Sequence, residues 1–239
     1  MTTNPLTELI THSDAIPQLQ PQRHLIFCQG DEWNSVYIVK DGWVLIYELL
    51  QDGRRQVLKI AGPGSVLGYM PPGSRYMTCT GECLTSVVLS VIPRRHFAQI
   101  VHDRPDLAIW LAGVLATDLE AAYRRLTIVG RCTAREKVAY LLAELACLSR
   151  STIHGQSNDG SILLLPVKRL QIGDALGLST EHICRVFRGF KDEGLIRAHN
   201  NRISVLNLQK LAEIAGMDIE TVDLHMPTPD ASVVHALRA

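Results

Sequence analysis

Glu181 and Arg185 stand four residues apart and carry the most specific chemistry in the sequence. An arginine can donate two hydrogen bonds to O6 and N7 of guanine, and a glutamate can accept one from the exocyclic amine of cytosine. At this spacing both side chains lie on one face of a helix, so together they can read adjacent base pairs of a CA/TG step. The alternative is an exposed salt bridge, which stabilises a helix by roughly 0.2–0.5 kcal/mol.

Polar and cationic residues around this pair predict contacts with the DNA backbone. Ser179 and Thr180 stand at the start of the same predicted helix, where a hydroxyl can cap the helix and the free backbone N–H groups suit a phosphate. Arg169, Arg188 and Lys191 are expected to pair with phosphates, which positions a protein on a duplex without reading its sequence.

Cys184 is predicted to lie on the groove face, between Glu181 and Arg185. Cysteines near cations and a helix N-terminus are the reactive kind, and oxidation to a sulfinic or sulfonic acid would set negative charge against DNA phosphates. Cys184 is therefore either a redox-sensitive residue or a small groove contact in place of serine, and both interpretations stay open. The predicted DNA-contacting residues are Arg169, Ser179, Thr180, Glu181, Cys184, Arg185, Arg188 and Lys191.

Apolar spacing predicts that two short helices joined by a tight turn present these side chains. Gly177 is expected to end the first helix, because glycine tolerates the left-handed backbone found there. An ordinary helical hairpin has the same spacing, so it is the polar face of the second helix that points to a DNA major groove. The predicted buried positions are Leu170, Ile172, Ala175 and Leu176, then Ile183, Val186, Phe187 and Phe190.

A β-hairpin is predicted directly after the second helix. Gly194 ends that helix, Leu195 and Ile196 begin one strand, and residues 203–206 form the returning strand. Asn200–Asn201 is the predicted turn between them. A hairpin in this place is typical of the wing of a winged helix-turn-helix.

These motifs resemble the DNA-binding domain of the CRP/FNR superfamily of bacterial transcription regulators. The family's L-G-L-[ST], E-x-x-x-R and E-G-L-I motifs match Leu176–Ser179, Glu181–Arg185 and Glu193–Ile196. The E-x-x-[SC]-R form, preceded by Thr180 rather than arginine, is more similar to the FNR/FixK branch. The resemblance implies a homodimer on an inverted repeat of the TTG-N8-CAA type. It also implies contact with RNA polymerase, most often as an activator.

Short apolar runs between His24 and Val91 alternate with turn signals and predict a β-sandwich or β-roll. The order of the glycines resembles the scaffold of cyclic-nucleotide-binding folds, so the resemblance covers residues from about 20 to 216. The matching positions are Gly30–Asp31, Gly42, Gly53, Gly64 and Gly68.

A long helix is predicted from Asp103 to Val129, with apolar residues at intervals of three and four. One interpretation is a helix packed on its own domain. The other, which the family resemblance favours, is a dimer interface, because a two-fold dimer suits a palindromic site. The seam residues are Leu111, Leu115, Leu119, Ala122, Leu126 and Val129.

The predicted class is therefore α+β: an N-terminal cyclic-nucleotide-binding-like β-roll, a long dimerisation helix and a C-terminal winged helix-turn-helix. The predicted parts are a lead-in at 1–20, a sensor-like β-roll at 21–102, the dimerisation helix at 103–130, the winged helix-turn-helix at 131–216 and a tail at 217–239.

The composition is that of an ordinary globular protein, with 239 residues, 46% hydrophobic residues and zero formal net charge. The positive charge is local, since residues 166–206 contain seven basic and four acidic residues. No apolar run approaches the roughly 18 residues of a membrane span, and no secretion signal is recognisable at the N-terminus. We therefore expect a cytoplasmic protein that binds double-stranded DNA and no membrane, with its six cysteines reduced.

The resemblance raises three input chemistries, and the sequence favours none of them. Where the family binds cyclic AMP through a glutamate and an Arg-Ser pair, this chain has Tyr69 or Met70 and Arg75–Tyr76. The first 27 residues contain no cysteine, so the N-terminal iron–sulfur cluster is not expected. Haem ligation in the family's manner would need Cys and His near Gly68, but ligation by other histidines stays open. No cofactor is expected, and a haem- or small-ligand-gated regulator of the same fold is the alternative.

An enzyme is the rival from another class. Cys79 and Cys83 would have to carry thiol redox catalysis, but their C-x-x-x-C spacing is not a redox motif, and no second pair makes a metal site. No nucleophile elbow, phosphate loop or pair of catalytic carboxylates is recognisable. The sequence therefore predicts a regulator and not an enzyme.

Overall fold

The computed structural model describes residues 17–71, 73–152, 163–199 and 202–219, and the chain divides into two compact units. Within the described residues, the first unit holds 17–49 and Lys59–Leu119, and the second holds Leu50–Leu58 and 120–219. Most of the predicted lead-in and tail, and the predicted Asn200–Asn201 turn, lie outside the described residues.

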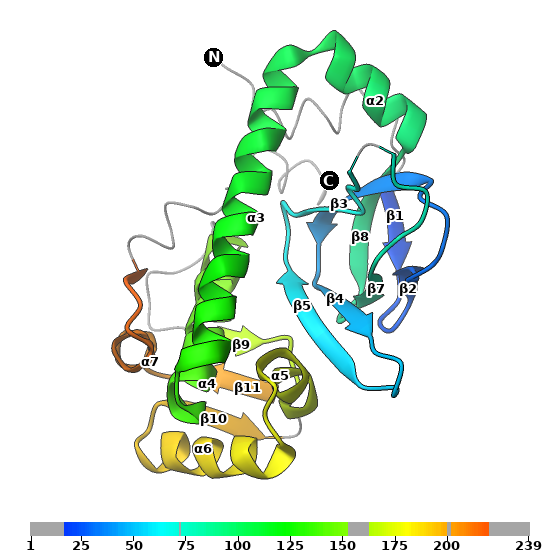
Figure 1. The fold of residues 1–239 in the computed structure, drawn as a ribbon. Helices are drawn as coiled ribbons and strands as arrows, with labels where there is room; N and C mark the ends of the chain where they lie inside the picture. The colour runs from blue at the N-terminus through cyan, green and yellow to red at the C-terminus, as the bar shows by residue number, and fades with distance from the viewer. Residues whose placement is uncertain (1–16, 72, 153–162, 200–201, 220–239) are drawn as a thin grey trace. The chain divides into compact units, whose positions relative to one another are not determined.

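Two four-stranded sheets form the β-roll (Figure 1). Their core-facing residues come from both sheets, among them Val36, Val44 and Leu89, which are almost fully buried. Gly42 joins β3 to β4 with φ of 83°, and a Cβ there would lie 2.2 Å from the Ser86 carbonyl oxygen, so no other residue fits. One sheet has the order β1 (Pro17–Gln20), β8 (Val87–Pro93), β3 (Ser35–Asp41), β6 (Val66–Leu67), and the other has β2 (Leu25–Phe27), β7 (Thr80–Cys83), β4 (Val44–Leu49), β5 (Arg55–Ala61).

Strand β1 was not expected, since Pro17–Gln20 fall in the stretch interpreted as a lead-in. The segment reads PQLQ, which has no strand signal of its own. It is a strand because it pairs antiparallel with β8, placing Leu19 opposite Val88 some seventy residues later. A pairing of that range leaves no local pattern in the sequence.

The helical connection between the units differs from the single predicted helix beginning at Asp103. The structure has α2 (Arg94–Asp103) and α3 (Pro105–Arg131), separated by Arg104, whose φ of −127° and ψ of 82° are not helical. Proline disfavours the helical conformation in the residue before it, which explains the break at Arg104. Leu111, assigned to the seam from sequence, is instead 5% exposed in the core of the first unit.

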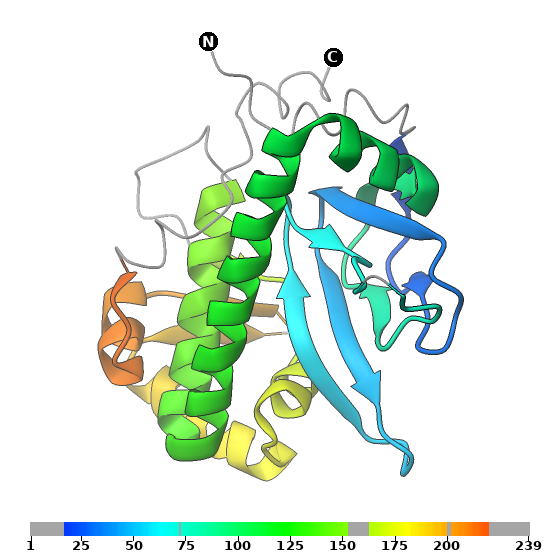
Figure 2. The ribbon, with the colours of Figure 1, turned by 45° about the horizontal axis from the view of Figure 1, so that its top comes forward.

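In the second unit, α4 (Ala134–Thr152) lies beside the C-terminal part of α3 (Figure 2). Val138, Leu142 and Leu145 of α4 are buried. A three-stranded antiparallel sheet has the order β10 (Ile196–His199), β11 (Arg202–Val205), β9 (Leu163–Leu165), and the helices α5 (Arg169–Leu176), α6 (Thr180–Asp192) and α7 (Leu208–Ala215) complete the unit. None of the helices in the described part of the chain is long and apolar enough to cross a membrane.

Candidate nucleic-acid interface

Helices α5 and α6 form the predicted helix-turn-helix, and the turn has the expected backbone chemistry. Gly177 ends α5 in the left-handed conformation, with φ of 63°, and Leu178 N–H donates to the Gly173 carbonyl. Ser179 is the N-cap of α6, because its hydroxyl oxygen accepts a hydrogen bond from the His182 backbone N–H at 3.3 Å. The turn therefore fixes where the recognition helix begins.

The inner face of α6 is apolar and closely packed. Ile183, Phe187 and Phe190 are at most 2% exposed, as their spacing predicts. The prediction for Leu170 in α5 was wrong, since that side chain is 61% exposed. Ile172 and Leu176 lie one turn apart on the buried face, and a residue two positions before Ile172 points to the opposite side of a helix.

The outer face of α6 exposes the polar side chains on which the DNA-binding prediction rests. Thr180, Cys184, Arg188 and Lys191 are all exposed. Arg185 Nη2 donates to Glu181 Oε1 at 2.9 Å, while the two side chains remain 70% and 81% exposed. The salt bridge considered from the sequence does form, but it uses one of the five N–H donors of Arg185 and one of about four acceptor sites of Glu181, so both side chains can still bond to other groups.

Arg169 has a second role besides the predicted phosphate contact. Its guanidinium lies over the Phe187 ring, 5.5 Å from the centroid, and the residue stays exposed. A cation over an aromatic face gains electrostatic attraction and loses little hydration. The contact holds the side chain at the junction of α5 and α6.

His182 was not singled out from the sequence, although it is exposed in the first turn of α6. Its Nδ1 lies 2.8 Å from the Ser179 hydroxyl, which also accepts the His182 backbone N–H. Which of the two groups donates depends on the tautomer of the ring: Nδ1 accepts from the hydroxyl when the ring proton is on Nε2 and donates to it when the proton is on Nδ1. The sequence did contain a signal for this contact. His182 stands three residues after the N-cap Ser179, a position from which side chains often hydrogen-bond back to the cap residue.

A paired contact between α4 and the C-terminal end of α6 was also missed. Arg135 donates to both carboxylate oxygens of Glu193, at 2.8 and 2.6 Å, and its guanidinium lies 4.9 Å from the Phe190 ring centroid. The hydrogen bonds with Arg135 hold the pKa of Glu193 below its ordinary value and raise that of Arg135. The contact joins residues 58 positions apart, so it could not be predicted from a local sequence pattern.

The wing follows α6 as predicted. Strands β10 and β11 pair with Ile196 opposite Val205, and both of these side chains are buried. Arg197 is exposed on β10 and adds a positive charge next to the helix-turn-helix. On its other side β11 pairs with β9, so the wing is the edge of a three-stranded sheet.

In the first unit, Tyr69, Met70, Arg75 and Tyr76 stand where the resemblance implies the residues of a cyclic-nucleotide site. Met70 is 7% exposed in the core, and the ring of Tyr69 packs edge-on against Phe97 at a centroid distance of 5.8 Å. Arg75 and Tyr76 are exposed. Met70 and Tyr69 therefore contribute to the packing of the first unit. The described part of the chain also holds no group of three metal-ligating side chains.

Two family models and several relatives match this chain. A cyclic nucleotide-binding domain matches residues 20–104, and a Crp-like helix-turn-helix domain matches residues 136–214. The chain is 30% identical over 194 residues to the transcriptional activatory protein AadR of Rhodopseudomonas palustris, a match that covers 81% of this chain and 78% of that protein. It is 33% identical over 177 residues to the nitrogen fixation regulation protein FixK of Rhizobium meliloti, covering 74% and 76%.

This chain belongs to the CRP/FNR family.

The solved structures of CRP/FNR proteins agree with this assignment. FixK2 from Bradyrhizobium japonicum is 26% identical with a TM-score of 0.72, and the match covers 84% of this chain and 96% of that one. TTHB099, a CRP-family regulator from Thermus thermophilus, shares the fold at 23% identity and a TM-score of 0.70, covering 84% and 98%. The predicted family and α+β fold are thus confirmed. With its helix-turn-helix domain, this CRP/FNR protein is a DNA-binding transcription regulator and not an enzyme.

Proposed function

We propose that this regulator binds as a homodimer to an inverted repeat of the TTG-N8-CAA type and activates transcription by contacting RNA polymerase. The single observation that carries the proposal is the outer face of α6, where Glu181 and Arg185 are exposed together on a helix whose inner face is buried. Relatives of this chain, including AadR, are named as transcriptional activators. Two copies of α6, one helical turn apart, would read the two half-sites.

On each half-site, Arg185 would pair with a guanine and Glu181 with a cytosine on the neighbouring base pair. The remaining predicted residues would position the helix. Ser179 and Thr180 lie at its start for a phosphate, and the exposed cations contact phosphates on either side. These cations are Arg169, Arg188 and Lys191. Cys184 would sit beside the bases, and its oxidation would weaken binding.

The homodimer is supported by an apolar stripe on α3 that remains exposed in the single chain. Leu115, Leu119, Leu126 and Val129 are 38%, 51%, 72% and 36% exposed, and they recur at coiled-coil spacing. Large apolar side chains aligned along one helix are typical of a surface that another helix covers. A second copy of the same helix would bury them all at once.

We further propose that the protein acts in the cytoplasm and that DNA binding needs neither cyclic AMP nor an iron–sulfur cluster. The packing of Tyr69 and Met70 supports independence from cyclic AMP, because these side chains take part in the core instead of facing a ligand. A haem- or small-ligand-gated regulator remains the alternative. An absorption spectrum of the purified protein tests for haem and for an iron–sulfur cluster, because both absorb visible light and the protein alone does not.

The function is tested by titrating a fluorescent TTG-N8-CAA duplex with the purified protein, against a duplex of the same composition with both half-sites scrambled. We expect at least about a thousandfold preference for the intact site at physiological salt. Sedimentation of the complex should give two chains per duplex. Equal affinity for the two duplexes would contradict the proposed site.

A further inference from the structure

The tip of the β4–β5 hairpin belongs to the second unit, together with the helix-turn-helix. Its turn is closed by Leu50 N–H donating to the Arg54 carbonyl at 2.8 Å, and an exposed Arg54–Asp52 ion pair lies on it. A turn that is hydrogen-bonded within itself can present the following residues in a fixed direction. Those residues are Arg55 and Gln56.

Arg55 and Gln56 both bond to the last turn of α5. Arg55 Nη2 and Nε donate to Asp174 Oδ2 at 2.8 and 3.2 Å, and Gln56 Nε2 donates to the Ala175 carbonyl at 3.3 Å. The Arg55 and Asp174 side chains are only 26% and 21% exposed, so their pairing is screened less than a surface ion pair. The carbonyls of a last helical turn lack partners inside the helix, and Gln56 supplies one.

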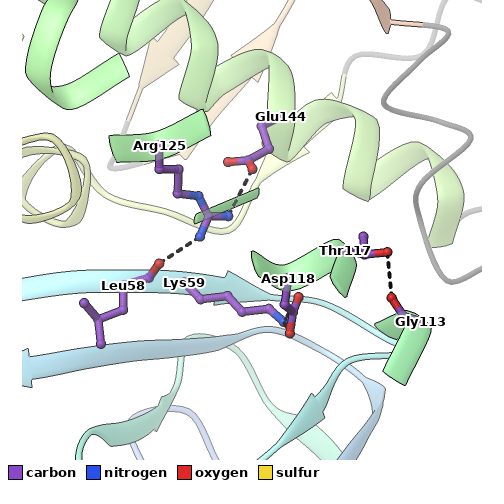
Figure 3. A network of polar contacts seen from close by, with 7 residues as sticks. All are labelled: Leu58, Lys59, Gly113, Thr117, Asp118, Arg125 and Glu144. Carbon is purple, nitrogen blue, oxygen red and sulfur yellow. Dashed lines mark hydrogen bonds and ion pairs between the residues drawn. The ribbon is translucent and has the colours of Figure 1, made fainter. Parts of the chain in front are cut away.

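The other end of the same hairpin segment is also held within the second unit. Arg125 of α3 donates to the Leu58 carbonyl at 2.8 Å and to Glu144 Oε1 at 3.0 Å (Figure 3). Glu144 is 5% exposed on α4, so this anchor is nearly buried. Residues 55–58 are therefore fixed at one end to α5 and at the other to α3 and α4.

The charge of Asp174 gives these contacts a consequence for DNA binding. In a helix-turn-helix the first helix crosses the DNA backbone, so a carboxylate on α5 would lie near phosphates in the complex, and charges closer than about 10 Å still interact at 0.1 M salt. An unpaired carboxylate there repels the duplex. Arg55 cancels that charge with a side chain that comes from the hairpin.

We propose that Arg55 is a positioning residue for DNA recognition, which cancels the charge of Asp174 and holds the end of α5 in place. The hairpin residues Leu50–Leu58 are then a functional part of the DNA-binding unit. The inference rests on DNA binding through the helix-turn-helix. It does not depend on the dimer or on the TTG-N8-CAA site.

The test is a mutant cycle of Arg55→Ala, Asp174→Asn and the double variant, with the affinity for both the TTG-N8-CAA duplex and its scrambled form measured by fluorescence anisotropy. We expect Arg55→Ala to weaken binding to both duplexes by about three- to tenfold, the range of one partly buried ion pair. Asp174→Asn alone should bind no worse than the parent. The double variant should return to the level of Asp174→Asn.

Two matched variants separate this role from others. Arg54→Ala removes the same charge from the same hairpin but not the contact with α5, and it should bind like the parent. Arg55→Lys keeps the charge and should retain most of the affinity even if Arg55→Ala unfolds. The proposal is overturned if Arg54→Ala weakens binding as much as Arg55→Ala, if Arg55→Ala lowers only the melting temperature, or if Asp174→Asn fails to restore binding. The parent's preference between the two duplexes tests the proposed site separately.

Discussion

Cys83 in the first unit and Cys184 in the second are both free thiols, but they lie in opposite surroundings. Burial in the β-roll raises the pKa of Cys83 to about 11, so its thiol stays protonated and unreactive near neutral pH. Cys184 is exposed on α6, beside Glu181 and Arg185. The same contrast holds for Tyr69, which is packed among aromatic rings, and Arg185, which faces solvent.

This contrast indicates that chemically active side chains serve packing in the β-roll and ligand contact on α6. The described β-roll uses its aromatic and thiol side chains to fill a core, whereas α6 keeps polar side chains in reach of a ligand. A buried polar group costs free energy unless it is bonded, so a face left polar and exposed is the one that meets a polar partner. If the exposed faces carry the function, variants on them should change DNA binding, and the largest effect is expected where the two copies meet.

Breaking the apolar stripe on α3 should have the largest effect, because it separates the two recognition helices. We expect the double variant Leu119→Asp, Leu126→Asp to be monomeric and to bind TTG-N8-CAA about 100-fold or more weakly, since the second half-site no longer adds avidity. Sedimentation and anisotropy titrations measure both properties. As a control, Leu25→Asp, at an apolar side chain 46% exposed on β2, should remain dimeric. If the double variant remains dimeric, α3 does not form the dimer interface.

Arg185→Ala should weaken binding by roughly 1–3 kcal/mol and relax the preference at one guanine of each half-site. The reason is the loss of a bidentate contact that no other side chain on α6 replaces. Lys191→Ala is the matched control, and it should weaken binding uniformly on all sequences because a phosphate contact carries no base preference. If Arg185→Ala instead loses affinity equally on every duplex, it does not read a base.

Hydrogen peroxide should lower the DNA affinity of the parent several-fold and leave Cys184→Ser unaffected. An oxidised Cys184 would carry negative charge against the duplex, while the buried, protonated Cys83 reacts slowly. Mass spectrometry of the treated protein identifies the oxidised residue, and anisotropy measures the loss. Equal loss in the parent and in Cys184→Ser would leave Cys184 as a small groove contact only.

The Arg135–Glu193 contact predicts a modest dependence of stability on pH. Because Arg135 lowers the pKa of Glu193 in the folded state, the pair stabilises the second unit above the ordinary carboxylate pKa of about 4.3. That contribution is lost as the pH falls through the lower folded value. Melting curves between pH 6 and pH 3 should show a smaller decline for Glu193→Gln than for the parent, and parallel declines would show that Glu193 is not linked to folding.

The features that were predicted correctly from the sequence are those set by residues close together in the chain. Gly177, the buried face of α6 and the wing were predicted because each depends on neighbours within one helical turn or one hairpin. The break at Arg104 was also encoded locally, in Pro105, but the predicted helix began two residues too early, at Asp103, and α2 was not predicted. Leu170 was assigned wrongly because an apolar residue near a predicted face was counted as part of it.

The contacts that position the interface were not predictable in this way. Arg135 bonds to Glu193 across 58 residues, and Arg55 bonds to Asp174 across 119. Neither pair has a spacing or composition that distinguishes it from other surface charges. Such pairs form only once the fold has brought their elements together, so the structure is needed to see them.

The central claim is that two copies of α6 read one face of a duplex, a single helical turn apart. It is tested most directly by inserting five base pairs into the spacer, which turns one half-site to the opposite face of the DNA. The affinities of TTG-N8-CAA and TTG-N13-CAA duplexes are compared at one salt concentration. The account predicts that the longer spacer lowers the affinity to that of a duplex with a single half-site. Equal affinity for the two spacers would contradict it.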